Sequence, residues 1–303
     1  MAVKFLGNDL HKFLGRLIAT NLTSKGAYKL TREFFLSALE KVDGALISGP
    51  SKAWIYQFYI LAILSWPFLI YPFSVSDIRR DFEGPATRLL KKWYKLAKPA
   101  NSAILFLPKS LNGMELTSPV EKFKSLQVSA LHHLSNSVDP MVSSLAAASR
   151  VRDSLSRSNK WKPAAALSSA ESVLDFNFAF RGQTGSAGLG FSSRAPRRKA
   201  ASPMAARRSD IAAIVKKDES DARIARLRAC PLAGNFLKWD NNLISSVSNW
   251  DHQILGMSEA EFSFILNAQA RPSLTHPTSA AGIVMSVLGA CCALNRPPLP
   301  STP

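Results

Sequence analysis

The feature that most limits the fold of this chain is a run of twenty residues without a charged side chain, WIYQFYILAILSWPFLIYPF at positions 54–73. A helix of that length, rising about 1.5 Å per residue, would just span the hydrocarbon core of a bilayer. Pro67 and Pro72 interrupt its second half, and Gln57 and Ser65 are polar. These interruptions favour a buried core helix over a membrane helix.

Apolar residues recur at helical spacing in other segments, so we expect a mainly α-helical fold. One stripe lies in residues 27–47, where the intervals are seven, four, three and four: Tyr28, Phe35, Leu39, Val42 and Leu46. Gly49–Pro50 is expected to end that helix. Further helical patterns cover residues 119–135, 139–157, 208–229, 236–255 and 258–270.

A basic helix is predicted to begin after Ser74 and to run to about Leu96, with a kink or split at Gly84–Pro85. One of its faces carries Leu89, Trp93 and Leu96, and another carries four cations, Arg88, Lys91, Lys92 and Lys95. Within LLKKWYKLAK, residues 89–98, no acidic residue interrupts the cationic face. A helix face whose charged side chains are all positive is typical of phosphate contact, whereas a solvated surface usually carries both positive and negative side chains.

The charge of the whole chain favours polyanionic partners, because 38 Lys and Arg residues against 21 Asp and Glu give a formal charge of +17. Nucleic acid and anionic membrane surfaces both fit this excess. Residues 181–208 concentrate Arg and Lys among Gly, Ser and Pro without any acid, which predicts a flexible basic linker.

The motifs of common catalytic sites are missing from the sequence. Polymerase chemistry requires clustered aspartates that hold two Mg²⁺ ions, and no two aspartates are adjacent here. The sequence also has no P-loop, no G-x-S-x-G and no H-E-x-x-H. We therefore predict no catalytic residue, no cofactor and no small-molecule substrate for this chain.

Cysteine and histidine usage predicts neither disulfides nor a metal site. The cysteines are Cys230, Cys291 and Cys292, an odd number with two adjacent residues, which favours a reducing compartment. The adjacent pair near His276 lacks the C-x-x-C spacing of zinc sites, and His132–His133 would point about 100° apart on a helix. Charged residues interrupt the first fifteen positions, so we expect an intracellular protein of the nucleus or cytoplasm that is not secreted.

Three strings follow one another in the first half of the chain. The first is K-F-L-G, formed by Lys12, Phe13, Leu14 and Gly15. The second contains W-I-Y-Q and a later L-x-W, and comprises Lys52, Trp54, Ile55, Tyr56, Gln57, Leu64 and Trp66. The third comprises Ala86, Thr87, Arg88, Leu90, Lys91, Lys92, Trp93, Leu96 and Lys98, followed by Leu105, Phe106, Pro108 and Gly113. A further string comprises Lys124, Gln127 and Val128, followed by Asp139–Pro140.

In this order the strings resemble the open reading frames of non-LTR (LINE-like) retrotransposons, in the stretch after the reverse transcriptase palm. The resemblance covers about residues 10–145, with a weaker likeness over 236–303. In that family K-[FY]-L-G follows the catalytic Tyr-x-Asp-Asp box, which is absent here. The resemblance implies a fragment of an RNA-directed DNA polymerase that carries the nucleic-acid-binding thumb and is inactive alone. Mg²⁺ is expected only for the missing catalytic palm.

The resemblance also implies a domain order. Residues 1–20 would be the end of the palm, with primer-grip-like Phe13, Leu14 and Gly15. Residues 21–160 would form a thumb-like helical domain, 161–207 a flexible linker, and 208–303 a C-terminal helical segment with a truncated or degenerate zinc-knuckle-like end.

The partner implied is an RNA or DNA primer–template, contacted by Lys12, Arg88, Lys91, Lys92, Lys95 and Lys98. The alternative is a membrane-associated helical protein with a transmembrane or interfacial segment at residues 54–73, although we do not expect a membrane partner. The sequence does not indicate whether the chain is a monomer or an oligomer.

Overall fold

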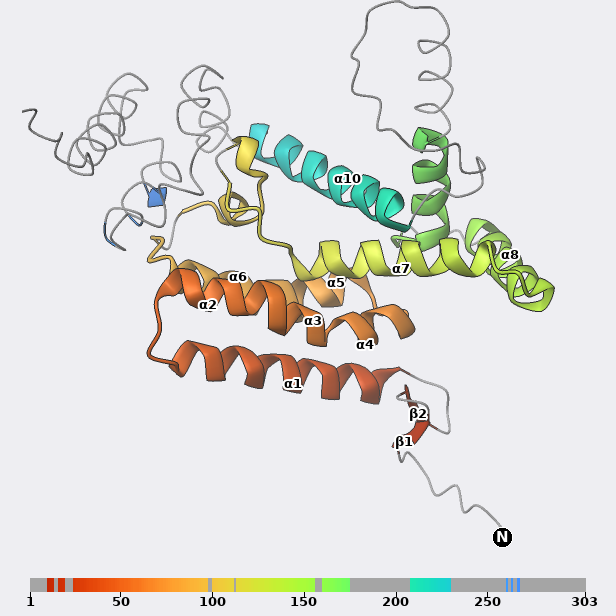
Figure 1. Cartoon of the computed structure of the whole chain (residues 1–303), viewed down its shortest axis with the longest axis horizontal. Coiled ribbons are helices and arrows are strands. Elements are labelled where there is room, and N and C mark those ends of the chain that lie inside the picture. The colour runs from red at the N-terminus through yellow and green to blue at the C-terminus, as the bar shows by residue number, and fades with distance from the viewer. Residues whose placement is uncertain are drawn as a thin grey trace, which may run out of the picture. The chain divides into compact units, whose positions relative to one another are not determined.

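The computed structural model is mainly α-helical, which confirms the predicted fold class (Figure 1). It describes residues 10–13, 16–19, 24–97, 100–111, 113–155, 160–174 and 208–229, and the single residues 260, 263, 266 and 267. A short hairpin, which the sequence analysis does not predict, pairs strand β1 (Leu10–Phe13) with strand β2 (Arg16–Ala19) in antiparallel register.

The helical elements follow the periodicity of the sequence in most segments. They are α1 (Lys25–Gly44), α2 (Gly49–Ile55), the π-helical η1 (Tyr56–Ile60), α3 (Leu61–Ile63), α4 (Ser65–Ile70), α5 (Val75–Ile78), the π-helical η2 (Arg79–Glu83), α6 (Gly84–Trp93), the 3₁₀ turns η3 (Ser102–Leu105) and η4 (Lys109–Leu111), α7 (Pro119–Ser135), α8 (Pro140–Leu155) and α10 (Arg208–Arg228). The predictions for α7, α8 and α10 are confirmed to within two residues.

Some predicted segments lie largely or wholly outside the described residues. The pattern at 236–255 and most of the basic segment 181–208 are among them, and only four residues of 258–270 are described. Residues 163–174, which the sequence analysis places in the linker, form a helix instead.

The apolar run is not the single buried helix that its composition predicts. It is divided among α2, η1, α3 and α4, and a turn at Leu64 precedes the segment with Pro67. Tyr71 then adopts an extended conformation, with φ −99° and ψ 132°, because the following Pro72 disfavours helical geometry. Tyr56, Leu64 and other side chains of the run are buried, but several aromatic ones are exposed. No helix among the described residues is long and apolar enough to cross a membrane.

The Gly49–Pro50 pair begins a helix, whereas the sequence analysis expects it to end one. α1 already stops at Gly44. Ser48 is the N-cap of α2, and its hydroxyl accepts a hydrogen bond from the amide of Ser51. Proline suits the first turn of a helix because the amide that it lacks would have no partner there.

Two compact units are formed, and neither is a continuous stretch of chain. Unit 1 contains Met1–Ser37, Ile60–Glu83 and Ser118–Glu219. Unit 2 contains Ala38–Tyr59, Gly84–Thr117 and Ser220–Pro303. This division differs from the linear order of domains expected from the sequence, because helices distant in sequence share one core.

Aromatic rings form the centre of unit 1. Phe68 of α4 meets Phe82 and Phe123, both with ring centroids 5.5 Å apart in edge-on geometry. Tyr28 of α1 contacts Phe82 in the same way at 5.7 Å. The Nε2 of Gln127 on α7 donates to the carbonyls of Phe68, Leu69 and Tyr71, at 2.6 to 3.3 Å. This amide satisfies the carbonyls of Phe68 and Leu69, which lie in the last turn of α4, and so holds α7 against α4.

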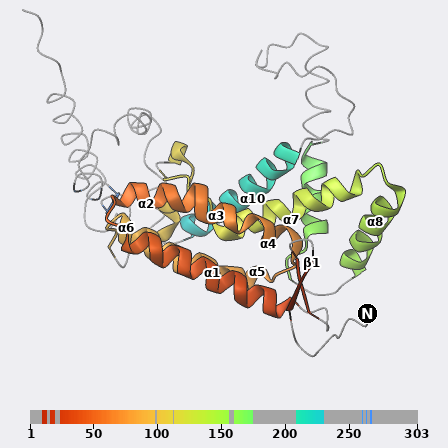
Figure 2. The same cartoon turned by 60° about the horizontal axis from the view of Figure 1, so that its bottom comes forward.

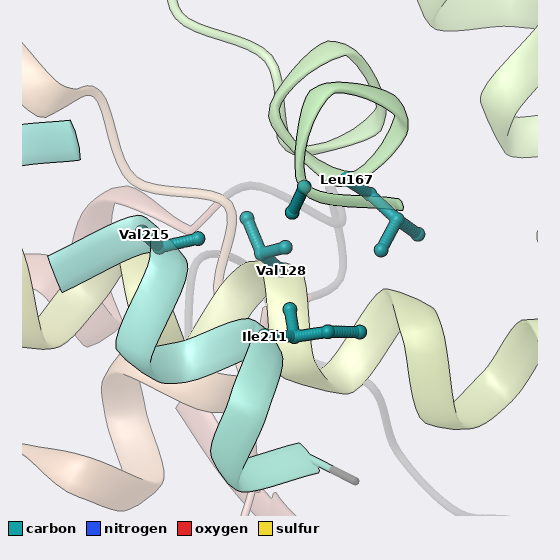
Figure 3. Packing of buried hydrophobic residues seen from close by; sticks show 5 residues of the cluster. Val128, Leu167, Ile211 and Val215 are labelled. Carbon is teal, nitrogen blue, oxygen red and sulfur yellow. The ribbon is translucent and has the colours of Figure 1, made fainter. Parts of the chain in front are cut away.

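A second apolar cluster in unit 1 explains why residues 163–174 are helical. Val128 of α7, Leu167 and Ala170 of that helix, and Ile211 and Val215 of α10 are all buried together (Figure 3). Beside the cluster, the carboxylate of Glu219 on α10 pairs with the ammonium group of Lys124. The apolar contacts thus hold α10 and the helix at 163–174 against α7, and only the latter lies where a linker was expected.

The close contact between α2 and α6 gives a stability prediction for Gly49. A Cβ atom at Gly49 would lie 2.0 Å from the carbonyl oxygen of Trp93, so Gly49→Ala must move one of the two helices. We expect a loss of about 2–3 kcal/mol in the free energy of unfolding, measured by urea denaturation.

Gly44→Ala is the matched control for that experiment. A Cβ atom at Gly44, in the last turn of α1, meets nothing within 4 Å. This variant should be neutral or more stable by up to about 1 kcal/mol. Equal destabilisation by the two substitutions would contradict the close contact of α2 with α6.

Candidate nucleic-acid interface

The basic helix predicted between Ser74 and Leu96 is divided into α5, η2 and α6, and the four residues of its cationic face lie on or just beyond α6, in unit 2. The buried stripe of α6 is Ala86, Leu90 and Trp93, whereas Leu89 is half-buried. Leu96 is buried but lies beyond the end of the helix. The buried face of α6 therefore includes Leu90, where the sequence analysis places Leu89, and α6 contacts both α2 and η3.

An acidic side chain from α1 contacts this basic segment. Asp43 accepts hydrogen bonds from the Nζ of Lys92 at 2.6 Å and from the Nε1 of Trp93 at 2.8 Å. Its backbone carbonyl accepts a third from the Nζ of Lys52 at 2.7 Å. The hydrogen bond from Lys92, and then that from Trp93, lower the pKa of the Asp43 carboxyl below its ordinary value. Asp43 thereby joins the ends of α1, α2 and α6.

The C-terminus of α6 closes with a Schellman motif. The amide of Leu96 donates to the carbonyl of Lys91 at 2.8 Å, and the amide of Lys95 donates to the carbonyl of Lys92 at 3.0 Å. Lys95 has a φ of 51°, in the left-handed region that glycine usually occupies at this position. Lys95 therefore does not continue the helical face on which the sequence analysis places it.

Lys91 has a structural role. Its ammonium group donates to the carbonyl of Ala100, in the loop that follows the helix. The side chain is partly buried, and desolvation lowers its pKa. A phosphate contact by Lys91 would have to compete with this bond.

Two residues far along the chain complete the end of α6, and sequence reasoning missed both. Asn267 donates from Nδ2 to the carbonyl of Lys95 at 3.0 Å, and its Oδ1 accepts from the amide of Ala97 at 2.8 Å. Ser263 donates from its hydroxyl to the same Lys95 carbonyl at 3.3 Å. No local signal in the sequence links residues about 170 positions apart.

Four of the six predicted phosphate contacts lie in one segment, and all of them but Lys91 are exposed. Arg88, Lys92 and Lys95 are exposed on α6 or just beyond it. Lys12 lies in β1, in unit 1, and only its backbone is described. Lys98 lies outside the described residues. Of the primer-grip-like residues Phe13 belongs to β1, and Leu14 and Gly15 lie outside the described residues.

Several residues of the three strings hold unit 2 together. The Tyr56 hydroxyl donates to the carbonyl of Thr117 at 3.0 Å, and the Gln57 amide exchanges two hydrogen bonds of 2.9 Å with Thr117. At Gly113 a Cβ atom would lie 2.1 Å from the carbonyl oxygen of Leu107. The residue types at Tyr56, Gln57 and Gly113 are therefore explained by hydrogen bonding and backbone geometry within unit 2.

The histidines that lie in the described part of the chain form no metal centre. His132 and His133 are in the last turn of α7, and burial lowers the pKa of His132. Across the described residues, no three His, Cys, Asp or Glu side chains gather as ligands. The three cysteines and His276 lie outside those residues.

The exposed cations at α6 can donate hydrogen bonds to phosphate oxygens. An arginine presents a planar fork of donors, and each lysine presents three donors on a flexible stem.

No family model, curated protein or solved structure matches this chain.

The Asp43 contact predicts a pH-dependent contribution to stability. Asp43→Asn removes a charge-assisted acceptor, so we expect a loss of about 1 kcal/mol near pH 7, a modest value because Lys92 is largely exposed. Because folding lowers the pKa of Asp43, its contribution is present above about pH 4 and disappears as the pH falls through the lowered pKa. Urea midpoints of parent and variant should therefore converge in acid. A gap that does not narrow there would contradict this role.

The left-handed conformation of Lys95 predicts that glycine is more stable there. Lys95→Gly should raise the free energy of unfolding by about 1 kcal/mol, because glycine adopts positive φ without a steric penalty. Lys95→Ala removes the same charge but keeps the strain, so thermal denaturation should show no gain. If both variants are stabilised equally, the cause is charge and not backbone geometry.

Proposed function

We propose that the chain is a nucleic-acid-binding fragment of a retrotransposon reverse transcriptase, which holds an RNA or DNA primer–template and has no polymerase reaction of its own. The observation that carries the proposal is the segment from α6 to Lys95, where three exposed cations follow one another and no acid lies between them in sequence. The order of the three strings supports the family, and the formal charge of +17 supports a polyanionic partner.

Arg88 and Lys92 are the main phosphate contacts in this proposal. They are four residues apart on α6, so their side chains are neighbours on one helix face. Arg88 is exposed, and its guanidinium can bind a phosphate with two parallel hydrogen bonds. Lys92 is also exposed, and its pairing with Asp43 uses one of three ammonium protons. The ion pair stabilises the fold only modestly, so a phosphate can share the ammonium group.

Binding of this type has little dependence on base sequence and a strong dependence on salt. Each phosphate that a cation neutralises releases counterion, so log affinity falls by roughly 0.7 to 0.9 per contact for each unit of log salt. Contacts to phosphate position the protein and do not read bases. Lys91, which is bonded to Ala100, is omitted from the set because its replacement would also disturb the fold.

The test is a triple variant, Arg88→Gln, Lys92→Gln and Lys95→Gln, titrated against a fluorescently labelled primer–template by anisotropy at several salt concentrations. The slope of log affinity against log salt should flatten by about two units. Unrelated nucleic acid sequences should lose affinity to a similar extent. Circular dichroism checks that helix content is kept, as expected for glutamine.

Two controls separate the interface from the general charge of the chain. The first removes the same number of cations from α1, by Lys25→Gln, Lys29→Gln and Lys41→Gln, all at exposed positions. The second replaces the cations of the basic segment, Arg194, Arg197, Arg198, Lys199, Arg207 and Arg208. If the α6 variant keeps the parent slope while a control loses it, the assignment to α6 is wrong.

A second candidate function is adsorption to a membrane surface, supported by an exposed aromatic cluster in unit 2. Trp54, Phe58 and Tyr59 are each more than half exposed, and the Trp54 ring lies 5.2 Å from that of Phe58 and 5.5 Å from that of Tyr59. Aromatic residues of this kind favour the membrane interface. Cosedimentation with vesicles rich in phosphatidylserine tests it, and loss of binding on Trp54→Ser with Phe58→Ser would support it.

A further inference from the structure

Helix α8 in unit 1 turns its large apolar side chains toward solvent. It packs beside α7 (Figure 2), yet Ala146 is its only buried residue. Four apolar side chains lie on its other side with high exposure, Met141 at 72%, Leu145 at 65%, Val151 at 58% and Leu155 at 76%. An isolated exposed leucine is ordinary, but a row of apolar residues along one helix marks an interaction surface.

These residues form a pattern that is the same in both chain directions. Relative to Ala148, which is also exposed, they lie at offsets of −7, −3, +3 and +7. At about 100° per residue, all five positions fall within roughly 60° of one line along the helix. We call this row the α8 seam, comprising Met141, Leu145, Ala148, Val151 and Leu155.

The symmetry of the seam identifies its occupant. In an antiparallel pair centred on Ala148, Met141 of one copy faces Leu155 of the other, and Leu145 faces Val151. The two Ala148 residues meet at the two-fold axis, where their small side chains allow the helices to approach closely. A two-fold interface uses the same patch on both copies, and a palindromic seam meets that requirement by itself.

Two polar residues, Ser144 and Arg152, fall within the same sector of the helix surface as the seam, and their positions also suit antiparallel pairing. Ser144 and Arg152 lie at offsets of −4 and +4 from Ala148, so each arginine faces a hydroxyl of the other copy. The two Arg152 positions are separated along the axis by eight residues, or about 12 Å. In a parallel pair in register, the two Arg152 side chains would face each other and repel.

We propose that α8 is a self-association site, through which two copies of the chain form a two-fold antiparallel helix pair. The exposed apolar surface of the seam is roughly 500 Å² per copy, below the about 800 Å² per partner that is usual for a stable complex. The dimer is therefore weak, with a dissociation constant on the order of 10–100 μM. This inference is independent of the proposed nucleic-acid function.

The first experiment is sedimentation equilibrium of the full chain from about 1 to 500 μM, a range that brackets the expected dissociation constant. The parent should pass from monomer to dimer. Leu145→Glu and Val151→Lys should each weaken the dimer at least tenfold, because a charge then faces an apolar residue. Both positions are exposed in the monomer, so the fold should be kept and circular dichroism checks this.

Mixing the two variants tests the direction of pairing. In the antiparallel pair the glutamate of one chain faces the lysine of the other, so an equimolar mixture of Leu145→Glu and Val151→Lys should associate again. In a parallel pair the two charges would not meet, and the mixture should stay as weak as its components. A parent that remains monomeric throughout, or a mixture without recovery, overturns the proposal.

Cross-linking gives an independent measure of register. In a chain with Cys230, Cys291 and Cys292 replaced by serine, Ala148→Cys should form an intermolecular disulfide on mild oxidation, because the position faces itself. Ser144→Cys is the matched control on the same helix side, and its two copies should lie about 12 Å apart and stay reduced. Equal cross-linking of both variants would indicate a parallel pair or random collision, and either result contradicts the antiparallel seam.

Discussion

The approach of α2 to the end of α6 is the contact on which the arrangement of unit 2 depends. Gly49 lies directly against the carbonyl of Trp93, where no larger residue fits. At the same end of α6, Asp43 of α1 accepts a hydrogen bond from Trp93, and its carbonyl accepts one from Lys52 of α2. The exposed cations of the candidate interface thus lie on α6, a helix whose packed end contacts Gly49 of α2 and the carboxylate of Asp43.

Local sequence signals predict the long helices of this fold well and its irregular ones poorly. α7 is predictable because Ser118 caps it, Pro119 occupies its first turn and its apolar residues keep a regular period. The two π-helical segments, η1 and η2, are missed because an extra residue per turn changes the period locally. Gly49–Pro50 is ambiguous in principle, since the same pair can follow one helix or open the next.

The sequence predicts which cations of the candidate interface are exposed, but it does not predict which residues hydrogen-bond to them. The exposure of Arg88 and Lys92 follows from helical spacing, whereas the acceptor for Lys92 comes from α1, about fifty positions away. The end of the helix is misjudged because Lys95 adopts the left-handed conformation normally signalled by glycine. Contacts between distant residues, such as that of Asn267 with Ala97, leave no local pattern to detect.

The docking of α10 on α7 has a consequence for how unit 1 can vary in sequence. Ile211 and Val215 pack in the cluster around Val128, and Glu219 pairs with Lys124, so the position of α10 is set by its own side-chain contacts. A change of volume at any one of these apolar positions affects three helices together, because α7, α10 and the helix at 163–174 all contribute to the cluster. Divergence at these positions therefore has to be concerted, with a substitution on one helix compensated on another.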